Sequence, residues 1–216
     1  MLTGLLGDIS PTVRNRAVIS LGKIGSSRII SQLLGAYSKE EDPGIRDRII
    51  TVSLDLNADL TISRLLERFS TTEDARYRAN LIRSLGLNAN SKGLELLTKA
   101  LKDPDGRVRA NAIEGLGVLN NPSLADLILP YLNDVNNRVR SNAATALWKL
   151  GGMGAVLTLR QMLRSSHKQM RSSAAWALGE IGVIQFSDVL QDLANDPDAD
   201  VRKCALKALA KVSKIT

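Results

Sequence analysis

Apolar residues recur along the chain at the spacing of an α-helix. The pattern is clearest in residues 105–119, where apolar positions fall at Val108, Ala112, Leu116 and Leu119. Intervals of three and four residues place such side chains on one stripe of a helix. Shorter apolar-periodic segments lie between stretches of this kind, for example at 58–69, 92–101 and 124–132. The pattern therefore predicts helix pairs, each made of a first helix A and a second helix B.

An arginine marks the same place in every copy of helix B. It recurs at intervals of 31 or 32 residues, as Arg14, Arg46, Arg78, Arg109, Arg140, Arg171 and Arg202. Seven copies at one period predict an array of about seven helix pairs. One pair cannot bury its apolar faces alone, so the copies must stack on one another along a continuous core.

Turn residues agree with this division into helices. Asp-Pro pairs at 42–43, 103–104 and 196–197 predict turns that feed the first helical positions. Glycines predict helix C-termini at Gly22 with Gly25, Gly151 with Gly152, and Gly179 with Gly182.

The repeated string V-R-x-x-A-x-x-x-L-G-x-[IL]-G resembles HEAT repeats, and the period resembles the short bacterial variety of the phycobilisome-lyase type. The resemblance covers the whole chain and implies an all-α fold, a right-handed α-solenoid with its concave side lined by the B helices. We expect one domain over 1–216. The segment MLTGLLG aligns only with the end of a helix A, so we expect an incomplete first repeat. Either the chain is a fragment of a longer protein, or this end is frayed or pairs with something else.

The resemblance also implies an Asp–Arg ladder that bonds across neighbouring repeats. In four copies an Asp stands six residues before the Arg, at Asp8, Asp103, Asp134 and Asp196, ahead of Arg14, Arg109, Arg140 and Arg202. Glu40, Thr72 and Ser165 occupy this position in the other copies. We therefore expect the ladder to be weaker there.

Composition and charge narrow the possible functions. With 44% hydrophobic and 24% charged residues the chain is in the globular range. The formal charge of +7 raises the possibility of nucleic-acid binding, but it is spread over both halves, and much of it belongs to the ladder arginines. Cys204 is the single cysteine, which excludes an intrachain disulfide and favours a cytoplasmic location. No run of 18 apolar residues predicts a membrane span.

No residue pattern predicts catalysis, a metal site or a cofactor. His167 is the single histidine, which excludes a multi-histidine metal site and a Ser-His-acid triad. Cys204 has no histidine placed to act as its base. The family resemblance leaves a bilin lyase or chaperone and a DNA glycosylase as less favoured hypotheses, since the chain has few aromatic residues and no acid placed beside its two tryptophans.

The B-helix face opposite the core stripe is the expected binding surface. Two residues after the ladder Arg, three consecutive copies carry Asn80, Asn111 and Asn142. Armadillo proteins, which share this architecture, hold the backbone of extended peptides with such asparagine arrays. Five residues after the Arg stand, among others, Arg83, Thr145 and Trp176. We expect Trp176 to be exposed and to form one groove with Trp148 of the preceding B helix.

The sequence thus predicts a monomeric, non-enzymatic scaffold that binds a protein or an extended peptide through this face. Three alternatives stay open. The asparagines can be ordinary solvated residues, and Trp176 can be a half-buried packing residue. The basic ends of the face can bind nucleic acid without sequence specificity.

Overall fold

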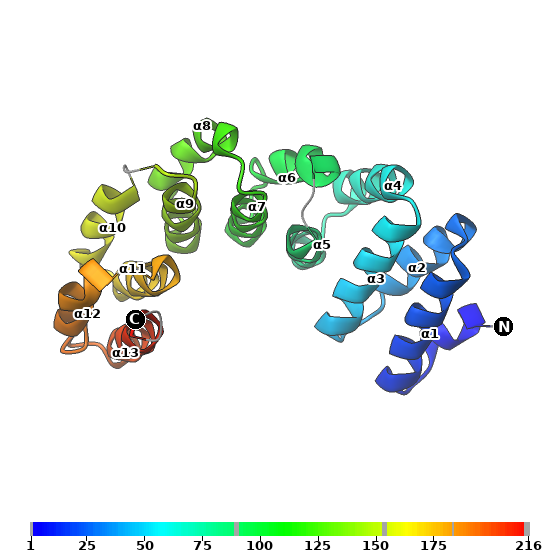
Figure 1. The fold of residues 1–216 in the computed structure, drawn as a ribbon, viewed down its shortest axis with the longest axis horizontal. Helices are drawn as coiled ribbons and strands as arrows, with labels where there is room; N and C mark the ends of the chain where they lie inside the picture. Colours follow the sequence, from blue (N-terminus) through cyan, green and yellow to red (C-terminus); the bar gives the residue numbers. More distant parts are fainter. Residues whose placement is uncertain (1, 89–90, 153–154, 183, 214–216) are drawn as a thin grey trace. The chain divides into compact units, whose positions relative to one another are not determined.

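The computed structural model describes residues 2–88, 91–152, 155–182 and 184–213, and every regular element in them is helical (Figure 1). The B helices are α1 (Pro11–Ile24), α3 (Pro43–Leu56), α5 (Ala75–Leu87), α7 (Gly106–Val118), α9 (Asn137–Lys149), α11 (Lys168–Ile181) and α13 (Ala199–Val212). Each of them contains one ladder arginine at its fourth position or close to it. The predicted B helices are confirmed.

The A helices alternate with the B helices, and all of them except α4 are shorter than the B helices. They are the 3₁₀ helix η1 (Leu2–Gly7), α2 (Ile30–Tyr37), α4 (Ala58–Thr71), α6 (Leu94–Ala100), α8 (Ala125–Ile128) with η5 (Leu129–Asn133), α10 (Ala155–Leu163) and α12 (Ser187–Leu193). Short 3₁₀ turns precede several of them, namely η2 (Ser27–Ile29), η3 (Ser91–Gly93), η4 (Pro122–Leu124) and η6 (Ile184–Phe186). The described residues therefore form the expected seven helix pairs of an all-α solenoid.

The helices fall into two compact units, Met1–Asp103 with α1–α6 and Pro104–Thr216 with α7–α13. None of the helices in the described part of the chain is long and apolar enough to cross a bilayer.

The core stripe lies where the sequence predicts it. The residue three positions after the ladder Arg is buried in every copy, as Ala17, Ile49, Leu81, Ala112, Ala143, Ala174 and Ala205. Five of these residues are alanine, which lets neighbouring B helices approach closely. At Gly179 of α11 an added Cβ would lie 2.8 Å from the Cβ of Ala208 in α13. Only glycine fits at such a crossing.

The helices begin near the predicted Asp-Pro pairs and end at predicted glycines, but two of them begin later than expected. Asp42 caps α3 by accepting the Ile45 N–H, and the next residue, Pro43, is the first of the helix. At the other two Asp-Pro pairs the helix begins two residues after the proline, because Asp105 and Asp198 provide the cap. Gly25 and Gly182 end α1 and α11 in the left-handed region, at φ 75° and 70°.

Candidate functional site

The ladder joins the Arg of one repeat to the acid that precedes the Arg of the next. One arginine and the acid it faces make one rung of the ladder, and a rung that has its acid is called filled. Each filled rung has two hydrogen bonds, from Nε and Nη2 of the arginine to the two carboxylate oxygens. The rungs are Arg14–Glu40 (2.7 and 2.9 Å), Arg78–Asp103 (2.7 and 3.1 Å), Arg109–Asp134 (2.8 and 2.8 Å) and Arg171–Asp196 (2.7 and 3.0 Å). Nη1 of these arginines also donates to the carbonyl five residues earlier. Each of these arginine side chains thus forms hydrogen bonds both to the turn before its own helix and to the turn of the next repeat.

These bonds lower the pKa of two of the carboxylates, Glu40 and Asp196. The hydrogen bond from Arg171 holds the pKa of Asp196 below its usual value, against the opposing effect of burial. Burial raises the pKa of Glu40, but hydrogen bonds from Arg14 and from the Asp42 N–H outweigh it, and the net shift is downward. The expectation of a weaker rung at Glu40 was therefore wrong, because the longer side chain reaches its arginine equally well.

Two rungs lack a carboxylate. Thr72 and Ser165 stand where the partners of Arg46 and Arg140 belong, and the Nε atoms of both arginines are buried without a hydrogen-bond partner among the described residues. The ladder assignment of Arg140 is corrected accordingly, since Asp134 bonds Arg109 instead.

Arg202 and Asp8, at the two ends of the ladder, form hydrogen bonds within their own turns. Arg202 donates to the carbonyls of Asp196 and Pro197 at 2.8 and 2.9 Å. Asp8 accepts the Ser10 N–H at 2.8 Å. Both residues stabilise the turn before their own B helix.

Trp176 lies beside two adjoining hollows on the B-helix side of the C-terminal unit. The larger, of about 350 Å³, is lined by Glu114, Asn137, Arg138, Ser141, Asn142, Ser172, Ser173, Trp176 and Cys204. The smaller, of about 120 Å³, is lined by Glu114, Gly117, Val118, Asn142, Thr145, Ala146, Lys149, Trp176 and Glu180. Trp176 is 40% exposed. We call the two together the Trp176 hollow.

The asparagines do not form an open array. Asn142 is buried, and its Nδ2 donates to the Ala110 carbonyl at 3.0 Å, while its Oδ1 is buried without a partner among the described residues. Asn111 is also buried, and its Oδ1 accepts from Arg138 at 2.9 Å. Asn80 lies half-buried in the N-terminal unit. The expected peptide grip was wrong for Asn111 and Asn142, because their position faces the neighbouring B helix.

Two other predicted binding residues, Thr145 and Trp148, lie in the C-terminal unit. Thr145 is buried and donates to the Ser141 carbonyl at 3.0 Å, although it still lines the smaller hollow. The Trp148 ring packs edge-on against Phe186, with 5.8 Å between centroids. It lines neither hollow beside Trp176, so the expected pair of tryptophans around one groove was wrong.

Arg83 is bound within the N-terminal unit. Its guanidinium forms an ion pair of 3.0 Å with Asp47, which also accepts from Ser84 Oγ at 2.6 Å. This pairing connects α3 to α5. It leaves Arg83 less available to a partner than its sequence position indicates.

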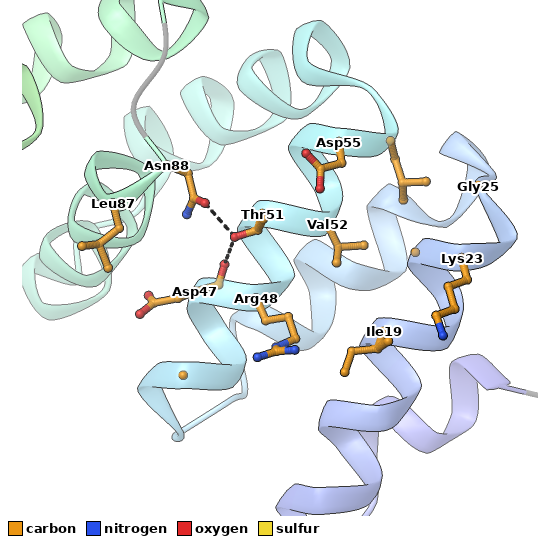
Figure 2. Close-up of a pocket in the computed structure, with 13 residues that line it drawn as sticks. Ile19, Lys23, Gly25, Asp47, Arg48, Thr51, Val52, Asp55, Leu87 and Asn88 are labelled. Carbon is orange, nitrogen blue, oxygen red and sulfur yellow. Dashed lines mark hydrogen bonds between the residues drawn. The ribbon is translucent and has the colours of Figure 1, made fainter. Parts of the chain in front are cut away.

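A larger hollow, of about 710 Å³, lies between α1, α3 and α5 and was not predicted (Figure 2). Lys23 and Arg48 lie on either side of Ile19, and Asp55 lies at another edge (Figure 2). Thr51 donates to Asn88 Oδ1 at 2.7 Å along one wall. In the sequence, the one signal for this hollow was Arg48, an exposed basic residue two positions after the ladder arginine Arg46.

No cluster of three or more metal-ligating side chains occurs in the residues that the structure describes. Cys204 is half-buried at the rim of the Trp176 hollow. His167 lies in an exposed turn, with Nδ1 3.3 Å from Ser166 Oγ.

Several solved structures are similar to this chain. The complex of CpcE and CpcF of phycocyanin lyase from Nostoc sp. PCC7120 is 20% identical over 99% of this chain and 90% of that one, with a TM-score of 0.55. Human deoxyhypusine hydroxylase in complex with glycerol is 18% identical over 99% and 83%, with a TM-score of 0.43. A designed armadillo repeat protein is 16% identical over 98% of both chains, with a TM-score of 0.42. At 20% identity, the likeness to the complex of CpcE and CpcF shows the fold alone.

The sequence itself matches one family. No curated protein matches the chain. The family model described as HEAT repeats matches residues 62–148 and 125–210, which together span more than half of the chain. The chain belongs to the HEAT-repeat family.

Proposed function

We propose that this HEAT-repeat chain is a non-enzymatic scaffold that binds a protein partner in the Trp176 hollow. The observation that carries the proposal is the exposure of a tryptophan that lines both of two adjoining hollows. A large exposed ring that lines a concavity is typical of an interaction site, because an apolar side chain of a partner can remove it from water.

The rim of the Trp176 hollow supports a protein partner over nucleic acid. The rim has both signs of charge, with Glu114 and Glu180 near Arg138 and Lys149. Glu114 lies 3.9 Å from Arg138, and Lys211 pairs with Glu180. Carboxylates at this place repel a phosphate backbone, whereas an apolar centre within a mixed polar rim is the usual anatomy of a protein interface.

A displayed library of random peptides tests the proposal. Peptides selected on the wild-type chain are measured for affinity to wild type and to Trp176→Ala. We expect the substitution to weaken them by about 30-fold, or about 2 kcal/mol, because tryptophan is a favoured hot-spot residue. Trp148→Ala serves as the matched control, since that ring packs on Phe186 outside the hollow. Selected peptides that bind Trp176→Ala as tightly as wild type would refute the proposal.

A further inference from the structure

One rung of the ladder inside the C-terminal unit has an arginine and no acid. Arg140 of α9 stands 25 residues before Ser165, as Arg109 and Arg171 stand 25 residues before their partners Asp134 and Asp196. In those two rungs the arginine Nε donates to a carboxylate at 2.8 and 2.7 Å. The Nε of Arg140 is buried and finds no hydrogen-bond partner anywhere in the described part of the chain. A guanidinium is therefore poised for an anion that the sequence does not supply.

Ser165 occupies the position of the missing acid. Its Oγ accepts the N–H of His167, two residues later, at 3.2 Å. Asp134 and Asp196 accept the N–H two residues later in the same way, at 2.8 and 2.9 Å. The Ser165 carbonyl accepts from Arg171 Nη1 at 2.8 Å, just as the Asp196 carbonyl accepts from the next ladder arginine. The turn thus presents the serine side chain as its counterparts present a carboxylate.

A phosphoryl group on Ser165 would have a suitable length for this rung. Phosphoserine places its terminal oxygens as many bonds from Cα as glutamate does. Glu40 shows that a side chain of this length fits the ladder, with hydrogen bonds of 2.7 and 2.9 Å to Arg14. Phosphate is a stronger acceptor with a charge of about −1.5 to −2 at neutral pH.

Charge in the turn singles out Ser165. Residues 164–168 read Arg-Ser-Ser-His-Lys, without an acid. Lys168 faces Asp198 and Asp200 at 3.1 and 3.3 Å, and so belongs to a separate ion pair. The other hydroxyl rung differs, because Thr72 is followed by Glu73 and Asp74, which would repel a phosphate. The segment around Ser165 is the more favourable of the two.

We propose that Ser165 is a phosphorylation site whose phosphate completes the rung with Arg140. A serine/threonine protein kinase would transfer the γ-phosphoryl group of a nucleoside triphosphate to Ser165 Oγ. The new bond between Ser165 Oγ and the γ-phosphorus forms as the bond from the γ-phosphorus to the β,γ-bridging oxygen breaks, the nucleoside diphosphate leaves, and the serine proton passes to the kinase base. The product ties α9 to α11. This inference does not rest on the proposed function.

Phosphoserine placed at residue 165 of the full chain by codon suppression tests the pairing. Phosphorus NMR follows the second ionisation of the phosphate, and phosphoserine at Ser166 is the matched control. Both positions share Arg164, His167, Lys168 and Arg171 as neighbours, so the comparison isolates Arg140. We expect the pKa of the phosphate at 165 to be lower than that at 166 by about one unit. Equal pKa values would overturn the rung.

Two further measurements test whether Arg140 is the partner of the phosphate and whether Ser165 is modified. Arg140→Gln should abolish the difference between the two positions, and a difference that persists in this variant would contradict the assignment. If the variant does not fold, the comparison with position 166 still decides. Intact and peptide mass spectrometry of the chain isolated from its source should then find phosphate on Ser165. Phosphate on Ser166 alone, or on neither serine, would refute the modification.

Discussion

At the scale of single residues, the hydrogen-bond geometry of the ladder explains why each repeat has an arginine rather than a lysine at this position. The planar guanidinium donates in two directions, to a carboxylate of the next turn and to a carbonyl of its own turn. A lysine ammonium cannot form the same pair of parallel bonds. Arg109 and Asp134 are 13% and 10% exposed, so the ion pair is largely shielded from water.

Removal of an arginine from a filled rung should cost more than its removal from an empty one. We expect Arg109→Ala to lower the free energy of unfolding by about 2–4 kcal/mol, because it leaves the half-buried Asp134 carboxylate without its partner. Arg140→Ala should cost less, since it leaves no carboxylate unpaired. Urea unfolding of both variants measures the difference. Equal losses would contradict this view of the ladder.

The Asp196 carboxylate should also make the free energy of unfolding depend on pH. The folded-state pKa of Asp196 is lower than its unfolded value near 3.8, so the unfolded chain binds the proton first as the pH falls. The contribution of Asp196 is therefore complete above that value and is lost as the pH falls through the lower, folded-state pKa. In Asp196→Asn, unfolding measured between pH 6 and about pH 2 should depend less steeply on pH. An unchanged slope would show that this carboxylate has an ordinary pKa.

At the scale of helices, the sequence predicts the elements better than the surface between them. The 31-residue spacing of the arginines and the stripe through Ala112 and Leu116 follow from properties of one helix, and both are confirmed. Which side of Asn142 faces solvent depends on a neighbouring helix 32 residues earlier, at Ala110. A helical wheel with one buried stripe omits that second contact, and so it places the asparagine on an open floor.

The contact between Trp148 and Phe186 escapes sequence analysis for the same reason. The two residues are 38 positions apart and lie in α9 and η6. Their meeting depends on how the A side of one repeat packs against the B helix of another. The repeat period predicts that such contacts exist but does not predict which side chains make them.

Glycine positions offer a direct test of B-helix packing. In Gly179→Ala the new methyl group would lie 2.8 Å from Ala208 Cβ. We expect a loss of about 1–3 kcal/mol, because α11 or α13 must shift. The control is Gly35→Ala in α2, where a Cβ meets no atom within 4 Å. That change should be neutral or stabilise by up to about 1 kcal/mol, since alanine favours helix. Similar thermal unfolding of both variants would contradict the close packing.

At the scale of the whole molecule, the net charge of +7 overstates the affinity for nucleic acid. Four of the seven ladder arginines are already neutralised by carboxylates. Binding to random DNA should therefore be micromolar or weaker at physiological salt and should weaken steeply as salt increases. Fluorescence anisotropy over a salt series measures both properties. Sub-micromolar binding that resists salt would favour nucleic acid over a protein partner.

The emission of Trp176 on binding tests the central claim most directly. Trp148→Phe leaves Trp176 as the single tryptophan and, as an aromatic replacement, should preserve the edge-on contact with Phe186. Because Trp176 is 40% exposed in the free chain, a selected peptide that covers the ring should shift its emission to shorter wavelength in proportion to occupancy. Peptide binding at saturation with no change in the emission would place the partner elsewhere and contradict the account.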